Sequence, residues 1–394
     1  MDARTRAPPP GSPAATYRAL VKEAMRPRQK RIYVLAWIIT YAALVATLAP
    51  AAPLRSFVVL SSVAVLATTV VPLLLFRRTH LIRAVPPRTL PCVSRASLVA
   101  HLLRADDAWH AVALHAACGA LVAMQCAVLQ VCLRGWSAPL SPMRYIDAHH
   151  AYYVNEAFLS AVSLGTTVGA AYAVAYMLLV PGGRRGVPPF SPTALGTSLR
   201  TRCLGALPRH VLRALMLLVA VPLLLLAYSL ARDTWWAAIL RVVGVETSVR
   251  RFLVPSFRVP YAPGALGLHA LPVITFLLVL FEATHTLFDV YWTQPLCAIP
   301  PRLNDPLTAL LGGLHDPHPF FSAHALAELA HWAQSEPARR HALFEDVQQQ
   351  HGRPMAFSSV ATACRRALDA LAPAEPAAPP APPPPPPPAP PPPP

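Results

Sequence analysis

The chain has 394 residues, of which 54% are hydrophobic and 13% are charged, and Lys and Arg outnumber Asp and Glu by 34 to 18. The charged share is about half that of an ordinary soluble protein, which excludes most classes of soluble enzyme. No nucleic-acid motif, and no basic surface interleaved with aromatic residues, accompanies the positive charge. We therefore expect no direct contact with nucleic acid.

Six apolar stretches follow one another along the chain, separated by arginine-rich segments. The stretches are 32–50, 56–76, 110–133, 157–180, 211–231 and 268–290. Each is long enough to cross the hydrocarbon core of a bilayer, which is roughly 30 Å thick, because a helix rises about 1.5 Å per residue. The sequence predicts an all-α polytopic membrane protein with a six-helix transmembrane domain at 32–290.

The basic residues between the stretches predict the orientation of this domain. The arm at 1–31 has eight, the 77–109 segment six and the 181–210 segment five, whereas 134–156 has two. The positive-inside rule puts the richer segments and both termini on the cytoplasmic side. The 232–267 segment, with five basic residues, fits this assignment least well.

Arginines at the ends of two stretches are candidates for contact with anionic lipid headgroups. They are Arg77 and Arg78 after the second stretch, and Arg184 and Arg185 after the fourth.

The fourth stretch carries small residues four positions apart. They are Ala161, Gly165, Gly169 and Ala173. A stripe of this kind lets a neighbouring membrane helix approach closely, so we expect it to be a packing face. The alternative is a chance pattern in an alanine-rich chain.

The sixth stretch contains Glu282, His285 and Asp289, which share one helical face. Ionisable residues inside a membrane segment indicate a functional or internally paired site. Structural pairing is the favoured interpretation, ahead of ion or proton transport, and a metal site is the weakest of the three.

Beyond the membrane domain, the prolines of 291–316 predict a linker. Residues 317–372 have the periodicity of three short helices, with a break from Ser335 to Pro337 between the first two. Such a small core is marginal alone and needs a partner or the membrane domain. Residues 373–394 are almost wholly Pro and Ala and predict a disordered or polyproline II tail.

Motifs for catalysis or cofactor binding are missing from the sequence. There is no P-loop, dinucleotide fingerprint or Gly-x-Ser-x-Gly elbow, and the seven cysteines form no C-x-x-C pair. The histidines near the start of 317–372 lack the spacing of zinc ligands. We expect no catalytic centre, cofactor or metal site.

Three local patterns recur in the same order as in a known family. They are Leu90-Pro91-Cys92-Val93-Ser94-Arg95 before the third stretch, Asn155-Glu156 before the fourth, and Ser335, Arg339, Arg340 and Phe344 in the soluble region. Over about residues 28–372 the chain resembles the transmembrane nucleoporins of the nuclear-division-cycle (Ndc) type. Members of that family usually continue into a long soluble domain, where this chain continues into polyproline.

The resemblance implies a non-enzymatic protein of the nuclear envelope, in the pore membrane where the inner and outer nuclear membranes fuse. Such proteins anchor soluble scaffold nucleoporins and help to insert pore complexes, and in fungi also spindle pole bodies. It also allows contacts with other pore-membrane proteins or with a second copy of the chain. The residues expected to face a partner are Phe320, Phe321, Leu329, Trp332, Arg339, Arg340 and Phe344. Some of the apolar ones are expected to form the local core instead.

Three other classes of protein compete with this interpretation. A secondary transporter or channel would use the Glu282 face as its polar path. A multispan viral envelope protein would share the Ala, Arg and Pro bias of a GC-rich genome. A membrane acyl- or glycosyltransferase is echoed only by His149 and His150.

Overall fold

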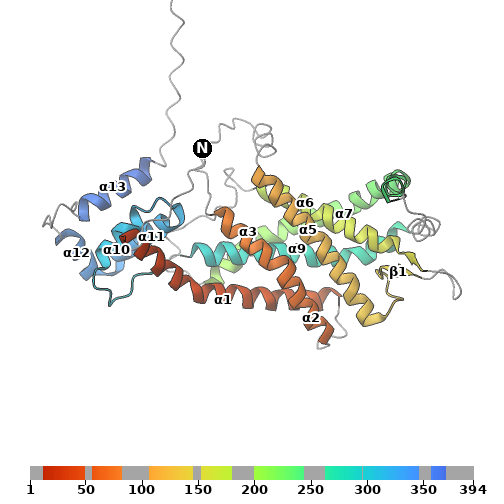
Figure 1. The fold of residues 1–394 in the computed structure, drawn as a ribbon, viewed down its shortest axis with the longest axis horizontal. Helices are drawn as coiled ribbons and strands as arrows, with labels where there is room; N and C mark the ends of the chain where they lie inside the picture. Colours follow the sequence, from red (N-terminus) through yellow and green to blue (C-terminus); the bar gives the residue numbers. More distant parts are fainter. Residues whose placement is uncertain are drawn as a thin grey trace, which may run out of the picture.

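The computed structural model shows an elongated helical molecule, with a bundle of long helices at one end and a group of short helices at the other (Figure 1). The structure describes residues 12–48, 56–81, 106–144, 152–179, 199–243, 262–294, 296–345 and 356–369. The predicted headgroup contacts Arg184 and Arg185 and the predicted tail at 373–394 lie outside these residues.

The bundle is formed by helices that correspond to the six apolar stretches. They are α1 (Pro13–Leu48), α2 (Ser56–Val65) with the π-turn η1 (Leu66–Val70) and α3 (Val71–Leu81), α5 (Asp106–Arg134), α6 (Glu156–Leu179), α7 (Leu199–Val243) and α9 (Pro263–Thr293). A two-residue antiparallel ribbon, β1 (Met143–Arg144) and β2 (Tyr153–Val154), precedes α6.

Five candidate membrane spans are found among the described residues, in α1, the α2–α3 unit, α5, α6 and α9. The protein is therefore a helical polytopic membrane protein. The predicted span at 211–231 lies in the 45-residue helix α7 and stays a prediction. Half of the most apolar window of α9 is buried, the largest share among the five, so α9 is the central helix of the bundle.

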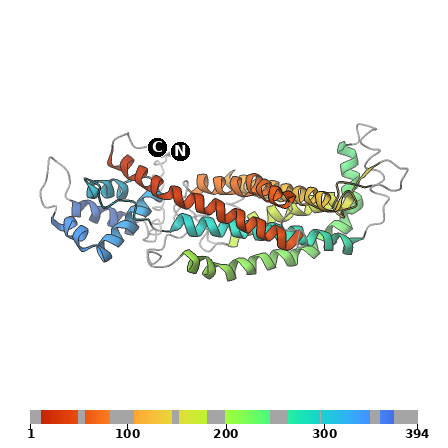
Figure 2. The ribbon, with the colours of Figure 1, turned by 90° about the horizontal axis from the view of Figure 1, so that it is seen from below.

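Helix α1 begins far earlier than the first apolar stretch. It starts at Pro13 and runs on through Pro27 into the bundle (Figure 2). Buried residues recur every four positions in its first half, at Tyr17, Val21 and Met25. Part of the predicted basic arm is thus helical, because the short helices cover its apolar face.

The second span contains a π-turn directly before Pro72. Proline lacks an N–H group and its ring clashes with the carbonyl four residues earlier, so a helix must adjust around it. Here the N–H of Val71 bonds to the carbonyl of Leu66, five residues back. Cys118 Sγ donates to the carbonyl of Thr69 within this turn, at 4.0 Å.

The short helices form a module, which we define as residues 296–345 and 356–369. It contains α10 (Pro306–Leu314), α11 (Pro319–Ser335), α12 (Pro337–Glu345) and α13 (Ala356–Asp369). The predicted break is confirmed, since α11 ends at Ser335 and α12 begins at Pro337. Helix α10 lies inside the predicted linker, where Asp305 caps it by accepting from Thr308 N at 3.0 Å.

Candidate functional site

The first half of α1 docks on the module, and this junction is the candidate functional site. The ring of Tyr17 packs against α10, where a Cβ on Gly313 would come within 2.4 Å of it. A Cβ on Gly312 would come within 2.4 Å of the Pro13 backbone. The adjacent glycines therefore allow α1 and α10 to approach closely, and a larger residue at either position would push them apart.

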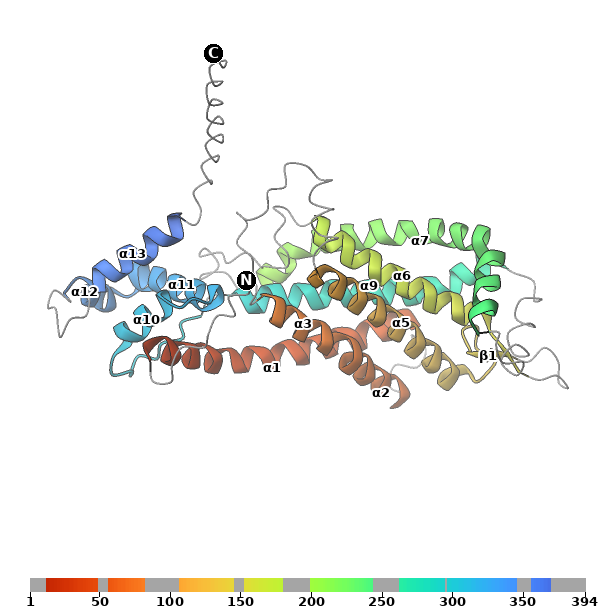
Figure 3. The ribbon, with the colours of Figure 1, turned by 45° about the horizontal axis from the view of Figure 1, so that its top comes forward.

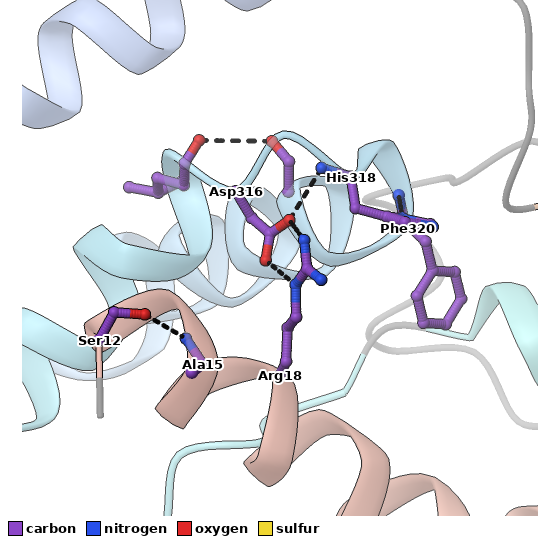
Figure 4. Close-up of polar contacts among 8 residues, drawn as sticks. Ser12, Ala15, Arg18, Asp316, His318 and Phe320 are labelled. Atoms are coloured by element: carbon purple, nitrogen blue, oxygen red, sulfur yellow. Dashed lines mark hydrogen bonds and ion pairs between the residues drawn. The ribbon is translucent and has the colours of Figure 1, made fainter. Parts of the chain in front are cut away.

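An ion pair fixes the orientation of α1 on the module (Figure 4). Arg18 donates from Nε and Nη2 to the two carboxylate oxygens of Asp316, at 2.5 and 2.6 Å. Asp316 also accepts from His318 N at 2.8 Å, and the Arg18 guanidinium lies 5.2 Å from the centre of the Phe321 ring. An arginine that donates two parallel hydrogen bonds to one carboxylate fixes the relative orientation of the two segments and also stabilises their contact.

A buried carboxylate joins three segments behind this ion pair. Glu328 of α11 has no exposed surface. It accepts from Ile299 N at 2.9 Å, Ala298 N at 3.2 Å and the Tyr17 hydroxyl at 3.2 Å. Burial raises the pKa of Glu328, while the two backbone N–H groups oppose that rise. The segment that leaves α9, the helix α11 and the helix α1 thus meet at one side chain.

Two arginines hold the end of α9 at the same junction. Arg28 of α1 donates to the carbonyl of Gln294 at 2.6 Å, and Arg202 of α7 donates to its side-chain oxygen at 2.5 Å. The last carbonyls of a helix carry partial negative charge, so cations are favourable there. Helices from distant parts of the chain are therefore gathered where the bundle meets the module.

Most residues predicted to face a partner lie inside the module instead. Phe321, Leu329 and Trp332 are buried and belong to its core, so for these three residues the structure favours the core alternative over contact with a partner. Phe320 packs against the rings of Trp292 at 5.7 Å and His324 at 4.6 Å. Helical spacing identified an apolar face but not what covers it.

The polar residues of the predicted partner face lie nearer the surface. Arg339 pairs with Glu336 at 2.8 Å, and its guanidinium lies 4.6 Å from the centre of the Trp332 ring. Arg340 is exposed. Phe344 lies in α12, but its side chain is outside the described part of the structure.

Two residues of the intramembrane polar face of α9, His285 and Asp289, are paired with other helices, and the third, Glu282, is buried. Arg77 of α3 donates to Asp289 at 2.6 Å and to Nδ1 of His285 at 3.0 Å. The Arg77 side chain is only 6% exposed, so the prediction that it contacts lipid headgroups is wrong. Its guanidinium instead compensates a carboxylate near the end of the bundle, while Arg78 is exposed.

The pairing continues into α5 through two histidines. Arginine can only donate, so Nδ1 of His285 accepts and its Nε2 carries the proton. That Nε2 is 3.1 Å from Nε2 of His115, whose Nδ1 lies 2.7 Å from the carbonyl of Ala111. Tyr172 of α6 stacks on both imidazoles. The sequence prediction missed His115 and Arg77 as partners of this face, although an ionisable residue within or beside an apolar stretch was the available signal.

The small-residue stripe of α6 packs against α5. A Cβ on Gly165 would lie 2.7 Å from the carbonyl oxygen of Gly119, and one on Gly169 would lie 2.2 Å from that of His115. Ala161 and Ala173 are buried as well. The complementary glycine of α5, Gly119, was not identified from the sequence.

A second buried ion pair lies at the other end of the bundle, where α6 begins. Glu156 accepts from Arg232 Nε at 2.6 Å and Nη2 at 2.9 Å. The Tyr228 hydroxyl and Trp236 Nε1 donate to the same carboxylate, at 3.1 and 3.3 Å. The sequence prediction did not pair Glu156, because its partners lie more than 70 residues away on α7.

Comparison with known proteins gives the family. A family model described as "Nucleoporin protein Ndc1-Nup" matches residues 28–392. Over 150 residues the chain is 31% identical to "Nucleoporin NDC1" of Chaetomium thermophilum, covering 36% of this chain and 22% of that relative. The chain thus matches about a fifth of the relative's length. The resemblance noted in the local sequence patterns is confirmed, and the chain belongs to the nucleoporin Ndc1 family.

Proposed function

We propose that the chain is a structural, non-enzymatic membrane anchor of the nuclear pore complex. The bundle resides in the pore membrane, both termini face the cytoplasmic side, and the module tethers soluble scaffold nucleoporins and aids pore assembly. Family membership and the apolar helices support the location. The observation that carries the tethering role is the junction, where α1 is one continuous helix shared by the bundle and the module.

A tether must transmit force between the membrane and its partner without coming apart. The Arg18–Asp316 ion pair and the Glu328 contacts join the module to α1, and Arg28 joins α1 to the end of α9. These contacts are buried or partly buried, where water screens charge less than at an open surface. They support a module held in a fixed position on the bundle.

We place the partner-facing surface on the outer side of α12 and α13, which pack together. Phe357 is 57% exposed, and Arg340, Arg365 and Arg366 are exposed on the same two helices. Exposed aromatic and arginine side chains are typical of interface hot spots. This surface replaces the buried face that the sequence predicted.

The contacts of the α9 polar face favour anchoring over the transporter alternative. Asp289 is neutralised by Arg77, and both ring nitrogens of His285 have partners. The aromatic rings of Tyr172 and Phe281 pack against this cluster. Because other helices supply the polar and aromatic partners of this face, its contacts support assembly of the bundle.

A charge swap at the junction tests the tether. We expect Arg18→Asp and Asp316→Arg singly to reduce recruitment of a scaffold nucleoporin to the nuclear rim, and the double variant to restore it. Lys22→Asp, an exposed charge reversal one turn along α1, is the control and should recruit normally. Tagged wild-type chain at the plasma membrane, or recruitment unaffected by either single swap, would contradict the proposal.

A further inference from the structure

A groove of about 230 Å³ lies between α6 and α7, which run side by side in Figure 3. Its α6 wall includes Ser160, Ser163 and Thr167. Its α7 wall includes Leu224, Ala227 and Ala231. We call it the α6–α7 groove. The α6 wall thus bears hydroxyl groups beside Leu164, and the α7 wall is aliphatic apart from Tyr228. The two alanines leave the space that larger residues would fill.

The bilayer is the source of any occupant. The outer side of α7 exposes a row of leucines beside the groove, Leu223, Leu226 and Leu230. A surface of this kind faces hydrocarbon in a membrane protein. Because α7 also contains the predicted span at 211–231, we expect a molecule that enters the groove to come from the lipid phase.

One hydroxyl in this wall has no hydrogen-bond partner among the described residues. Ser160 is 4% exposed and its Oγ bonds to nothing. The neighbouring hydroxyls differ, since Ser163 donates to the Ser160 carbonyl at 3.1 Å and Thr167 donates to the Ser163 carbonyl at 2.9 Å. A buried polar group without a partner is costly, and a ligand hydroxyl would relieve that cost, because serine can both donate and accept.

The depth and charge of the groove limit the class of lipid that can bind in it. Ser160 lies one turn, about 6 Å, along α6 from Glu156. Glu156 is matched by Arg232 and by the donors Tyr228 and Trp236, so the two opposite charges beside Ser160 compensate each other. The site suits an uncharged headgroup that carries a single hydroxyl just inside the membrane interface.

We propose that the α6–α7 groove binds a membrane sterol, with the sterol hydroxyl on Ser160 and the rings between the hydroxyl wall and the aliphatic wall. A rigid ring system loses less conformational freedom on binding than a flexible acyl chain does. This favours a sterol over a phospholipid tail in a groove with two walls of different chemistry.

Photolabelling of the full-length protein in phosphatidylcholine nanodiscs tests the site. A photoreactive cholesterol probe should label α6 and α7 residues of the groove, and unlabelled cholesterol should compete. Ala231→Phe should abolish labelling by filling the groove, whereas Leu223→Phe, which adds the same ring on the exposed side of α7, should not. Labelling that spreads evenly over the bundle, or that a photoreactive phosphatidylcholine reproduces at the same residues, would overturn the proposal.

The role of the hydroxyl is tested separately. Ser160→Ala should weaken cholesterol competition by about fivefold, the effect of one hydrogen bond. Ser163→Ala should change it little, because that hydroxyl already bonds within its own helix. A sterol that lacks the 3-oxygen can make no such bond and should compete equally well for the wild-type groove and for the Ser160→Ala groove. Equal loss in both serine variants would contradict the assignment of Ser160.

Discussion

The contact between α5 and α6 and the contact between α1 and the module hold helices together by different means. Helix α6 meets α5 through glycine backbones that almost touch. Helix α1 meets the module through an arginine, a tyrosine and two buried carboxylates. In a bilayer the surroundings are as apolar as the helices, so association depends on close packing and polar pairing. Outside it, burial of apolar surface drives docking, and charged pairs set the geometry.

The largest expected effect comes from the glycine contact. We expect Gly119→Ala to destabilise the bundle by about 3 kcal/mol, at the upper end for overpacking, because the added Cβ would lie 2.1 Å from the carbonyl oxygen of Gly165. Thermal unfolding followed by size-exclusion fluorescence in detergent measures it. Gly264→Ala, in α9 with no atom within 4 Å of the new Cβ, is the matched control. Equal melting of both variants would mean that α5 and α6 are not in this contact.

Removal of one partner of the intramembrane ion pair should cost nearly as much. Asp289→Leu leaves the Arg77 guanidinium buried and without its carboxylate, which costs about 3 kcal/mol. The double variant Arg77→Met with Asp289→Leu should regain most of that loss, since replacement of a buried pair by apolar residues is often neutral. Thermal unfolding of the single and double variants gives the comparison. A double variant less stable than the single would show that the pair itself stabilises the bundle.

Lowering the pH should destabilise the module through protonation of His324. Burial lowers the pKa of its imidazole from 6.5 to about 3. The unfolded chain therefore binds a proton between these values and the folded chain does not. Above pH 6.5 the neutral imidazole of His324 contributes fully to the free energy of unfolding. This contribution falls as the pH drops, by about 2 kcal/mol at pH 5. Thermal unfolding of the full chain between pH 7.5 and 5 should show this loss, and His324→Leu should flatten it.

Glu328 acts in the opposite direction and supplies the control for that titration. Its pKa is raised in the fold, so its contribution is present below the unfolded pKa and is lost as the pH rises through the folded value. Lowering the pH therefore raises the contribution of Glu328 to the free energy of unfolding. Without this gain, the Glu328→Gln variant should lose stability more steeply than wild type as the pH falls. A shallower loss in this variant would contradict the assigned direction.

The smallest expected effect is that of a single hydroxyl at the junction. Tyr17→Phe removes the donor to Glu328 but keeps the ring on Gly313. We expect a loss of about 1 kcal/mol, typical of one hydrogen bond, in thermal unfolding. Tyr33→Phe, on the exposed side of the same helix, should have no measurable effect.

The sequence predicts local features well and distant contacts poorly. The length of the apolar stretches predicts the helices of the bundle, and the break at Pro337 is found where periodicity placed it. Periodicity does not indicate which face is covered by another part of the chain. The sequence therefore predicts Trp332 among the partner-facing candidates, whereas the structure buries it in the core.

The polar contacts could not be predicted from single segments of the sequence, because their partners lie far apart in the chain. Tyr17 and Glu328 are 311 positions apart, and Arg77 and Asp289 are 212 apart. Considered alone, each of these side chains could equally well contact solvent or lipid headgroups. Only the arrangement of helices shows that charges placed far apart in the chain compensate one another.

The unbroken course of α1 has a mechanical consequence. A 36-residue helix is about 54 Å long, with one end in the bundle and the other clamped to the module. For a straight helix of that length, a tilt of roughly 10° at the membrane end displaces the far end by about 9 Å. Pro27 is the point in α1 where a kink would reduce this displacement. A tilt of the bundle is thereby passed along α1 to α10 and α11, rather than being absorbed in a loose linker.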